Sequence, residues 1–159
     1  SLEVITDLDY PLFLGKFFSR PTEKILEDIP KILGNNFKLT KWELEAVIEA
    51  AKKSHIAVLP LDPFGTLNPL KPENRLLMMW RMGLPTLTSP SLAYLRVMSE
   101  TQIDGICHSP KEWQEKIINF MESLELRKES VEKGQQYIRD KHSKEILLNA
   151  WDELFESVL

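Results

Sequence analysis

Short strand-like runs alternate with amphipathic helical segments along this chain, and this alternation restricts the fold more than any other feature. The runs lie at residues 2–6, 37–40, 56–59, 84–88 and 103–107. The run at 56–59 contains no polar residue, which is typical of a parallel strand buried on both faces. Parallel strands need crossover connections, usually helices. The sequence therefore predicts an α/β fold, with a Rossmann-like parallel sheet of about five strands flanked by helices, in a single domain over residues 1–159.

Capping residues mark several of the expected helices. Pro72 and Gly83 bound a helix whose inner face carries Leu76, Met79 and Trp80. We expect further helices at residues 22–33 and 147–158, the latter with an apolar core face, and an irregular segment at residues 8–20. The other expected caps are Thr40 with Glu43, Ser89 with Pro90, and Ser109 with Glu112 and Pro110.

The composition restricts the class of protein. The chain has 159 residues, 43% of them hydrophobic and 28% charged, and a net charge of −4. Nucleic-acid-binding proteins normally show a basic face, so this balance disfavours nucleic acid as a partner. One cysteine, Cys107, excludes an intramolecular disulfide and indicates a reducing compartment, and we expect it to be buried. No run approaches the roughly 20 apolar residues of a membrane span, and no signal peptide is evident. Because strand-like sequence begins directly after Ser1, we expect the chain to be an excised piece of a longer enzyme.

Two connections are placed for ligand binding, because parallel sheets bind ligands at the carboxyl ends of their strands. They are the long loop at residues 60–71 and the short turn at residues 88–91, and each leads to a helix amino terminus that favours an anion. Cations at such a position suit a diphosphate, while a carboxylate and an amide suit ribose or base hydroxyls. Charged residues in a first turn also commonly form only a solvated face, and serines only a cap, so both interpretations stay open. The candidate ligand-binding residues are Gly65, Thr66, Lys71, Glu73, Asn74, Arg75, Ser89 and Ser91.

Other chemistries find little support in the sequence. Neither a G-x-G-x-x-G motif nor a P-loop is present, and the six glycines are scattered. The histidines are not at metal-ligand spacing, so we expect neither a metal nor another cofactor. His108 follows a strand and is the best placed of the three, but a lone histidine is weak evidence. No nucleophile–base pair is recognisable, and the catalytic residues stay unassigned.

The ordered series of segments from residue 37 to 159 resembles the donor-binding domain of GT-B retaining glycosyltransferases, the group 1 family. Asn74 and Arg75 are similar to an Asn-Lys pair of the family, and the residues Gly-Leu-Pro at 83–85 to its Gly-x-Pro helix exit. Residues 91–94, 104–106, 109–113 and 137–155 resemble the segments that follow. The resemblance implies the C-terminal half of a GT-B fold.

The resemblance also implies a function. The domain would bind a nucleotide-diphosphate sugar, with Arg75 and Lys71 neutralising a diphosphate whose charge grows in the transition state, and with Asn74 and Glu73 contacting hydroxyls. The full-length enzyme would transfer the sugar to a saccharide or glycolipid acceptor, held by an N-terminal half that this chain lacks. It would work without a metal in the cytoplasm, with peripheral association at the inner face of the membrane. The isolated chain would be inactive.

The sequence departs from the family at two positions. Met78 and Leu70 stand where many members carry a pair of glutamates, one of which binds the donor ribose. Two alternatives therefore stay open. One is a nucleotide-sugar 2-epimerase on the same fold, which would need carboxylates and a histidine facing the sugar. The other is a non-catalytic scaffold domain that has lost its donor site.

Overall fold

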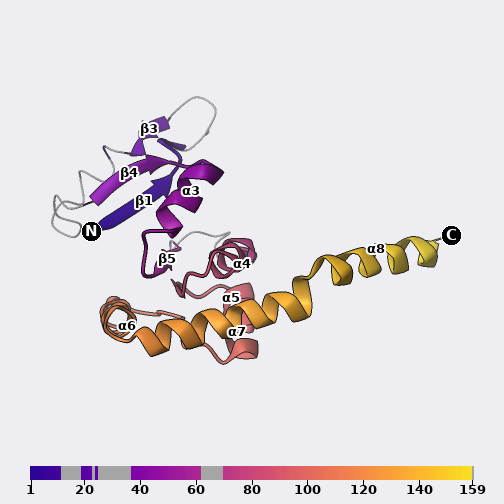
Figure 1. Ribbon diagram of the computed structural model, residues 1–159. Helices are drawn as coiled ribbons and strands as arrows, with labels where there is room; N and C mark the ends of the chain where they lie inside the picture. The colour runs from indigo at the N-terminus through magenta and orange to yellow at the C-terminus, as the bar shows by residue number, and fades with distance from the viewer. Residues whose placement is uncertain (12–18, 23, 25–36, 62–69, 159) are drawn as a thin grey trace. The chain divides into compact units, whose positions relative to one another are not determined.

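The computed structural model describes residues 1–11, 19–22, 24, 37–61 and 70–158. The chain divides into two compact units, Ser1–Lys53 and Ser54–Leu159, and we describe each by itself. Each unit combines parallel strands with helices, so the predicted mixed α/β class is confirmed (Figure 1). A single parallel sheet of about five strands is not formed by the described residues, and that part of the prediction is wrong: their strands form separate pairs.

The first unit is built on two parallel strands and a helix. β1 (Leu2–Thr6) pairs with β4 (Phe37–Lys41) over their full lengths, and α3 (Leu44–Ala51) buries Val47 and Ala50. β2 (Asp9–Pro11) and β3 (Ser19–Pro21) form an antiparallel pair, so the segment expected to be irregular contains two short strands. Most of the helix expected at residues 22–33 lies outside the described residues.

The expected capping box at the start of α3 is not formed. Thr40 lies within β4, and its hydroxyl donates a hydrogen bond to Glu3 Oε1 on β1 at 2.7 Å. Glu43 itself is the N-cap residue, and no described side chain caps the helix there. The Thr40 hydroxyl, which the sequence pattern predicted to cap the helix, is therefore bonded across the two strands.

The second unit is built around two adjacent parallel strands. β5 (Ala57–Leu59) pairs with β6 (Thr86–Thr88), and α4 (Asn74–Arg81) lies in the connection between them. α5 (Leu92–Thr101) follows β6. The strand expected at residues 103–107 is reduced to a parallel bridge between Thr88 and Ile106, with Cys107 N–H donating to the Thr88 carbonyl at 2.8 Å.

Helices α6 (Pro110–Glu122) and α7 (Leu124–His142) complete the core of this unit. On one side of β6, fully buried Trp80 and Leu76 pack with Tyr94 and with Tyr137 of α7. On the other side, Leu87 packs with Phe120 and with Cys107, which is buried as predicted. The remaining residues of the larger cluster are Leu77, Val97, Met98, Ile103, Ile106 and Ile138.

Most of the expected caps in the second unit are confirmed. Gly83 ends the α4 segment with a φ of 77°, a conformation that favours glycine. Ser109 Oγ accepts a hydrogen bond from Glu112 N–H at 3.2 Å, and Pro110 occupies the first turn of α6. The expected cap of α5 was placed two residues too early, because Ser91 and not Ser89 accepts from the first-turn amide of Tyr94.

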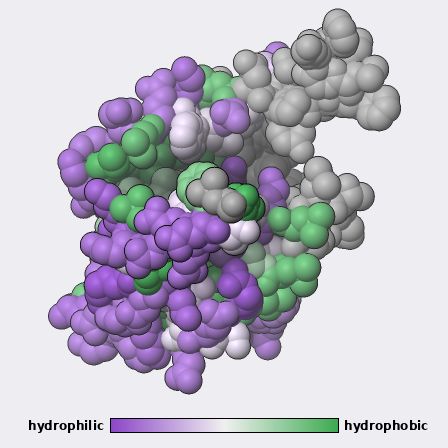
Figure 2. Space-filling model, turned by 90° about the vertical axis from the view of Figure 1, so that its right-hand side faces the viewer, coloured by the Kyte–Doolittle hydropathy of each residue, from purple (hydrophilic) through white to green (hydrophobic). Residues whose placement is uncertain are grey.

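The last helix, α8 (Lys144–Val158), does not bury its apolar residues within the described chain. The expectation of a core face was wrong: Trp151 is 56% exposed and Phe155 58% exposed. In Figure 1 this helix extends past the end of α7, and Figure 2, which views that side, shows apolar surface exposed among hydrophilic side chains. Among the described helices, none is both long and apolar enough to cross a membrane.

Candidate functional site

A cavity of about 250 Å³ lies in the second unit at the amino-terminal end of α4. Three residues predicted for a donor site converge on it: Lys71 just before the helix, and Asn74 and Arg75 in its first turn. The rest of its described lining consists of Leu61, Pro72 and Tyr94. Positive side chains, an amide and the start of a helix thus surround one small space.

The order of the elements explains this convergence. β5 and β6 are adjacent parallel strands, so their carboxyl ends lie at one edge of the pair. Leu61 leaves that edge after β5, and Tyr94 lies in the first turn of α5, which follows β6. Ligands of parallel sheets bind at this edge, where the first amides of a helix lack partners within the helix. The cavity is therefore where strand order predicts a ligand.

The two predicted serines fix the backbone beside the cavity. Ser89 Oγ accepts a hydrogen bond from Leu61 N–H at 3.0 Å, and Ser89 N–H donates to the Leu59 carbonyl at 3.2 Å. Ser91 is buried, and its hydroxyl donates to the Lys71 carbonyl at 3.3 Å. These bonds tie the exits of β5 and β6 to the segment that carries the cations. Neither serine is among the lining residues described for the cavity.

The side chain of Glu73 pairs with Arg96 and does not line the cavity. Its Oε1 accepts a hydrogen bond from Arg96 Nη2 of α5 at 2.6 Å, and its side chain is 17% exposed. This bond raises the pKa of the Arg96 guanidinium further. Glu73 is not part of the described cavity lining, so no carboxylate belongs to that lining.

Tyr94 lines the cavity, although sequence reasoning did not select it as a site residue. It is only 1% exposed, and burial raises the pKa of its phenol, while the charges of Arg75 and Glu73 act on it in opposite directions. The phenol is therefore neutral, and its hydroxyl is a hydrogen-bond donor, at neutral pH. A tyrosine at a helical core position carries the same sequence signal as a packing residue, which is why the pattern did not reveal it.

Two predicted residues cannot be compared with this geometry. Gly65 and Thr66 belong to residues 62–69 and lie outside the described residues. Leu70, which ends this loop, is 68% exposed. The structure places the other candidates, which are Lys71, Glu73, Asn74, Arg75, Ser89 and Ser91.

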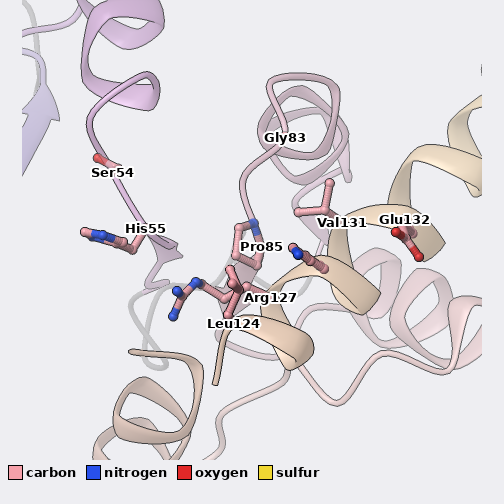
Figure 3. A pocket seen from close by; sticks show the side chains of 9 residues that line it. Ser54, His55, Gly83, Pro85, Leu124, Arg127, Val131 and Glu132 are labelled. Atoms are coloured by element: carbon pink, nitrogen blue, oxygen red, sulfur yellow. The ribbon is translucent and has the colours of Figure 1, made fainter. Parts of the chain in front are cut away.

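A second cavity, of about 340 Å³, lies near the amino end of β5 (Figure 3). Its lining comes from three segments: His55 and Ser54 before β5, Gly83 and Pro85 after α4, and the first turns of α7. Arg127 of α7 also donates to the Phe120 and Met121 carbonyls at the end of α6, at 2.6 Å and 2.8 Å. Since this guanidinium already caps a helix and the cavity lies away from the carboxyl ends of the strands, the first cavity is the better candidate.

Among the described residues, the remaining titratable groups do not gather into a reaction centre. His108 is exposed, and its backbone N–H donates to Glu112 Oε2 at 3.1 Å. No group of three or more His, Cys, Asp or Glu residues in the described part of the chain could hold a metal ion. The chain matches no protein-family model, and neither curated proteins nor solved structures gave a significant match.

Proposed function

We propose that this chain is the donor-binding half of a GT-B-type glycosyltransferase, and that the first cavity binds the diphosphate of a nucleotide sugar. The observation that carries the proposal is the convergence of Lys71, Asn74 and Arg75 on one cavity at the amino end of α4. A diphosphate offers several anionic oxygens, and helix amides with two cations are a suitable set of partners for them.

In the proposed reaction, these groups act on the leaving diphosphate. Cleavage of the bond between the sugar and the diphosphate concentrates negative charge on the phosphate oxygens. Fixed cations at Lys71 and Arg75 would stabilise that charge more in the transition state than in the bound donor, which accelerates the transfer. The acceptor saccharide or glycolipid would bind to the other half of the enzyme.

One alternative has a specific observation in its favour, namely a scaffold domain without a donor site. Met78 stands where many family members carry a glutamate, and the carboxylate of Glu73 is held by Arg96. A scaffold would bind no nucleoside diphosphate, whereas the donor half binds one of them selectively. Binding of a nucleoside diphosphate therefore separates the two functions.

The test is a calorimetric titration of the chain with UDP, GDP, ADP and CMP. We expect selective binding of one nucleoside diphosphate and a loss of about tenfold to a hundredfold in affinity for Arg75→Ala, the usual range for a hydrogen bond to a charged group. Arg81→Ala is a matched control, because Arg81 lies at the other end of α4 and donates to the His142 carbonyl at 3.4 Å.

Two results would contradict the proposal. One is a folded Arg75→Ala variant that binds the nucleotide as tightly as the wild type. The other is the absence of binding to every nucleoside diphosphate, by this chain and by a longer protein that contains it.

A further inference from the structure

We propose that the hydroxyl of Tyr94 donates a hydrogen bond to a phosphate oxygen of the ligand, which makes Tyr94 a further binding residue of the first cavity. This inference rests on the proposed function and adds a residue to it that neither the sequence pattern nor the family resemblance had assigned.

The position of the tyrosine supplies the first argument. Its ring belongs to the core cluster with Leu76 and Trp80, and only 1% of the residue is exposed, yet Tyr94 lines the cavity. The charges that act on its phenol belong to Arg75 and Glu73, both at the start of α4. Tyr94 thus belongs both to the core cluster and to the cavity lining.

The unmet hydrogen-bonding capacity of this hydroxyl is the second argument. Buried tyrosine hydroxyls usually find a partner. Within the part of the chain that the structure describes, the Tyr94 hydroxyl makes no hydrogen bond, and it is not among the fully enclosed side-chain atoms without a partner, which belong to Trp80, Thr88 and Ser130. The residue's capping bond, from its own N–H to Ser91 Oγ, involves the backbone. A ligand in the cavity would supply the missing acceptor.

The surrounding charges select the kind of acceptor. Lys71 and Arg75 line the same cavity, and no carboxylate belongs to its described lining, because Glu73 is bonded to Arg96. The side chains of Tyr94, Lys71 and Arg75 all donate hydrogen bonds, and two of them are positively charged. An occupant of the cavity must therefore carry several acceptors and negative charge. A space of about 250 Å³ is smaller than the roughly 300–1,000 Å³ that encloses a drug-sized ligand, so it suits a diphosphate group without its base.

The experiment compares Tyr94→Phe with Tyr137→Phe in titrations with inorganic pyrophosphate and with the nucleoside diphosphate that the wild type prefers. Tyr137 is a suitable control, because it is also buried, its phenol pKa is also raised by burial, and it does not line the cavity. We expect Tyr94→Phe to weaken the binding of both ligands by about tenfold or more, and Tyr137→Phe to leave both unchanged.

The outcomes separate this inference from the proposed function. If Arg75→Ala weakens binding but folded Tyr94→Phe binds like the wild type, the role of Tyr94 is wrong and the donor site stands. If neither this chain nor a longer protein that contains it binds pyrophosphate or any nucleoside diphosphate, both are wrong. A spectroscopic measurement covers the case in which Tyr94→Phe does not fold. In wild-type protein labelled at the tyrosine ring carbon that bears the hydroxyl, saturating pyrophosphate should shift the Tyr94 signal and not the Tyr137 signal. An unmoved Tyr94 signal would overturn the inference.

Discussion

Replacing Gly134 by alanine tests the closest helix contact in the second unit, where α7 packs on α4. An alanine Cβ at this position would lie 2.4 Å from Trp80 Cδ2 and 2.6 Å from Trp80 Cγ. Favourable carbon contacts lie at about 3.5–4.0 Å, so the methyl group would be more than about 1 Å too close. Trp80 is fully buried beside Leu76 and Tyr94, and it has no open side toward which to move.

The expected cost follows from two opposing effects. Overpacking a core usually costs about 1–3 kcal/mol, and a clash with three atoms of a buried ring belongs at the upper end of that range. Alanine is a better helix former than glycine by about 1 kcal/mol, which offsets part of this cost. We therefore expect Gly134→Ala to lower the free energy of unfolding of the second unit by about 2 kcal/mol.

Urea unfolding followed by far-ultraviolet circular dichroism measures this change. Gln136→Ala on the exposed face of α7 is the control, and it should stay within about 0.5 kcal/mol of the wild type. Trp80→Leu destabilises the unit by itself, but it removes the ring, so adding Gly134→Ala to it should cost nothing further. A Gly134→Ala variant as stable as the wild type would refute the packing argument.

Two further predictions concern a cap and a carboxylate. Ser109→Ala removes the acceptor of Glu112 N–H at the start of α6 and should cost about 1 kcal/mol in the same urea assay, while Ser157→Ala, at the exposed end of α8, should cost nothing measurable. The pKa of Glu3 is held below its ordinary value of 4.5, first by the hydrogen bond from Lys38 and then by that from Thr40. A lowered pKa stabilises the folded state at pH values above the ordinary pKa, and this stabilisation is lost as the pH falls through the folded pKa. The protection of the β1 and β4 amides from hydrogen exchange should therefore weaken in that acid range for the wild type, and should weaken less for Glu3→Gln. An identical acid response in both proteins would contradict the second prediction.

The best-predicted elements are those whose signals are local. The helix between Pro72 and Gly83 was recognisable because proline suits a helix start, glycine adopts the left-handed conformation at its end, and Leu76 and Trp80 share one face. β5 was recognisable from its unbroken apolar run. Each of these preferences acts within a few residues, and the surrounding structure does not oppose it.

The predictions failed where distant residues compete for the same group. Thr40 and Ser89 are both acceptable cap residues, but the structure uses the first for Glu3 and the second for Leu61. The apolar face of α8 has the spacing of a core helix, and spacing does not say which surface covers it. The predicted number of strands was wrong for a related reason. Residues 103–107 form a single bridge beside β6 and do not extend it into a paired strand.

The candidate site was partly predictable. Lys71, Asn74 and Arg75 were found because strand order places a helix start at the ligand edge, and they do line one cavity. Tyr94 was missed, since a buried aromatic at helical spacing usually serves the core. Glu73 was grouped with them by sequence proximity, but the turn directs its side chain toward Arg96.

Ser91 links the segment that carries Lys71 to the start of α5, which carries Tyr94. Its hydroxyl accepts from Tyr94 N–H at 3.2 Å and donates to the Lys71 carbonyl at 3.3 Å, so one buried group joins the cap of α5 to the backbone of a cation-bearing segment. Lys71 follows the long loop after β5, and a loop end without such a tie would lose conformational entropy on binding a ligand. The same hydroxyl fixes the turn that carries Tyr94. In the proposed site, the backbone that carries Lys71 and the turn that carries Tyr94 would therefore be held together before a ligand binds, which favours charge stabilisation by preorganised groups.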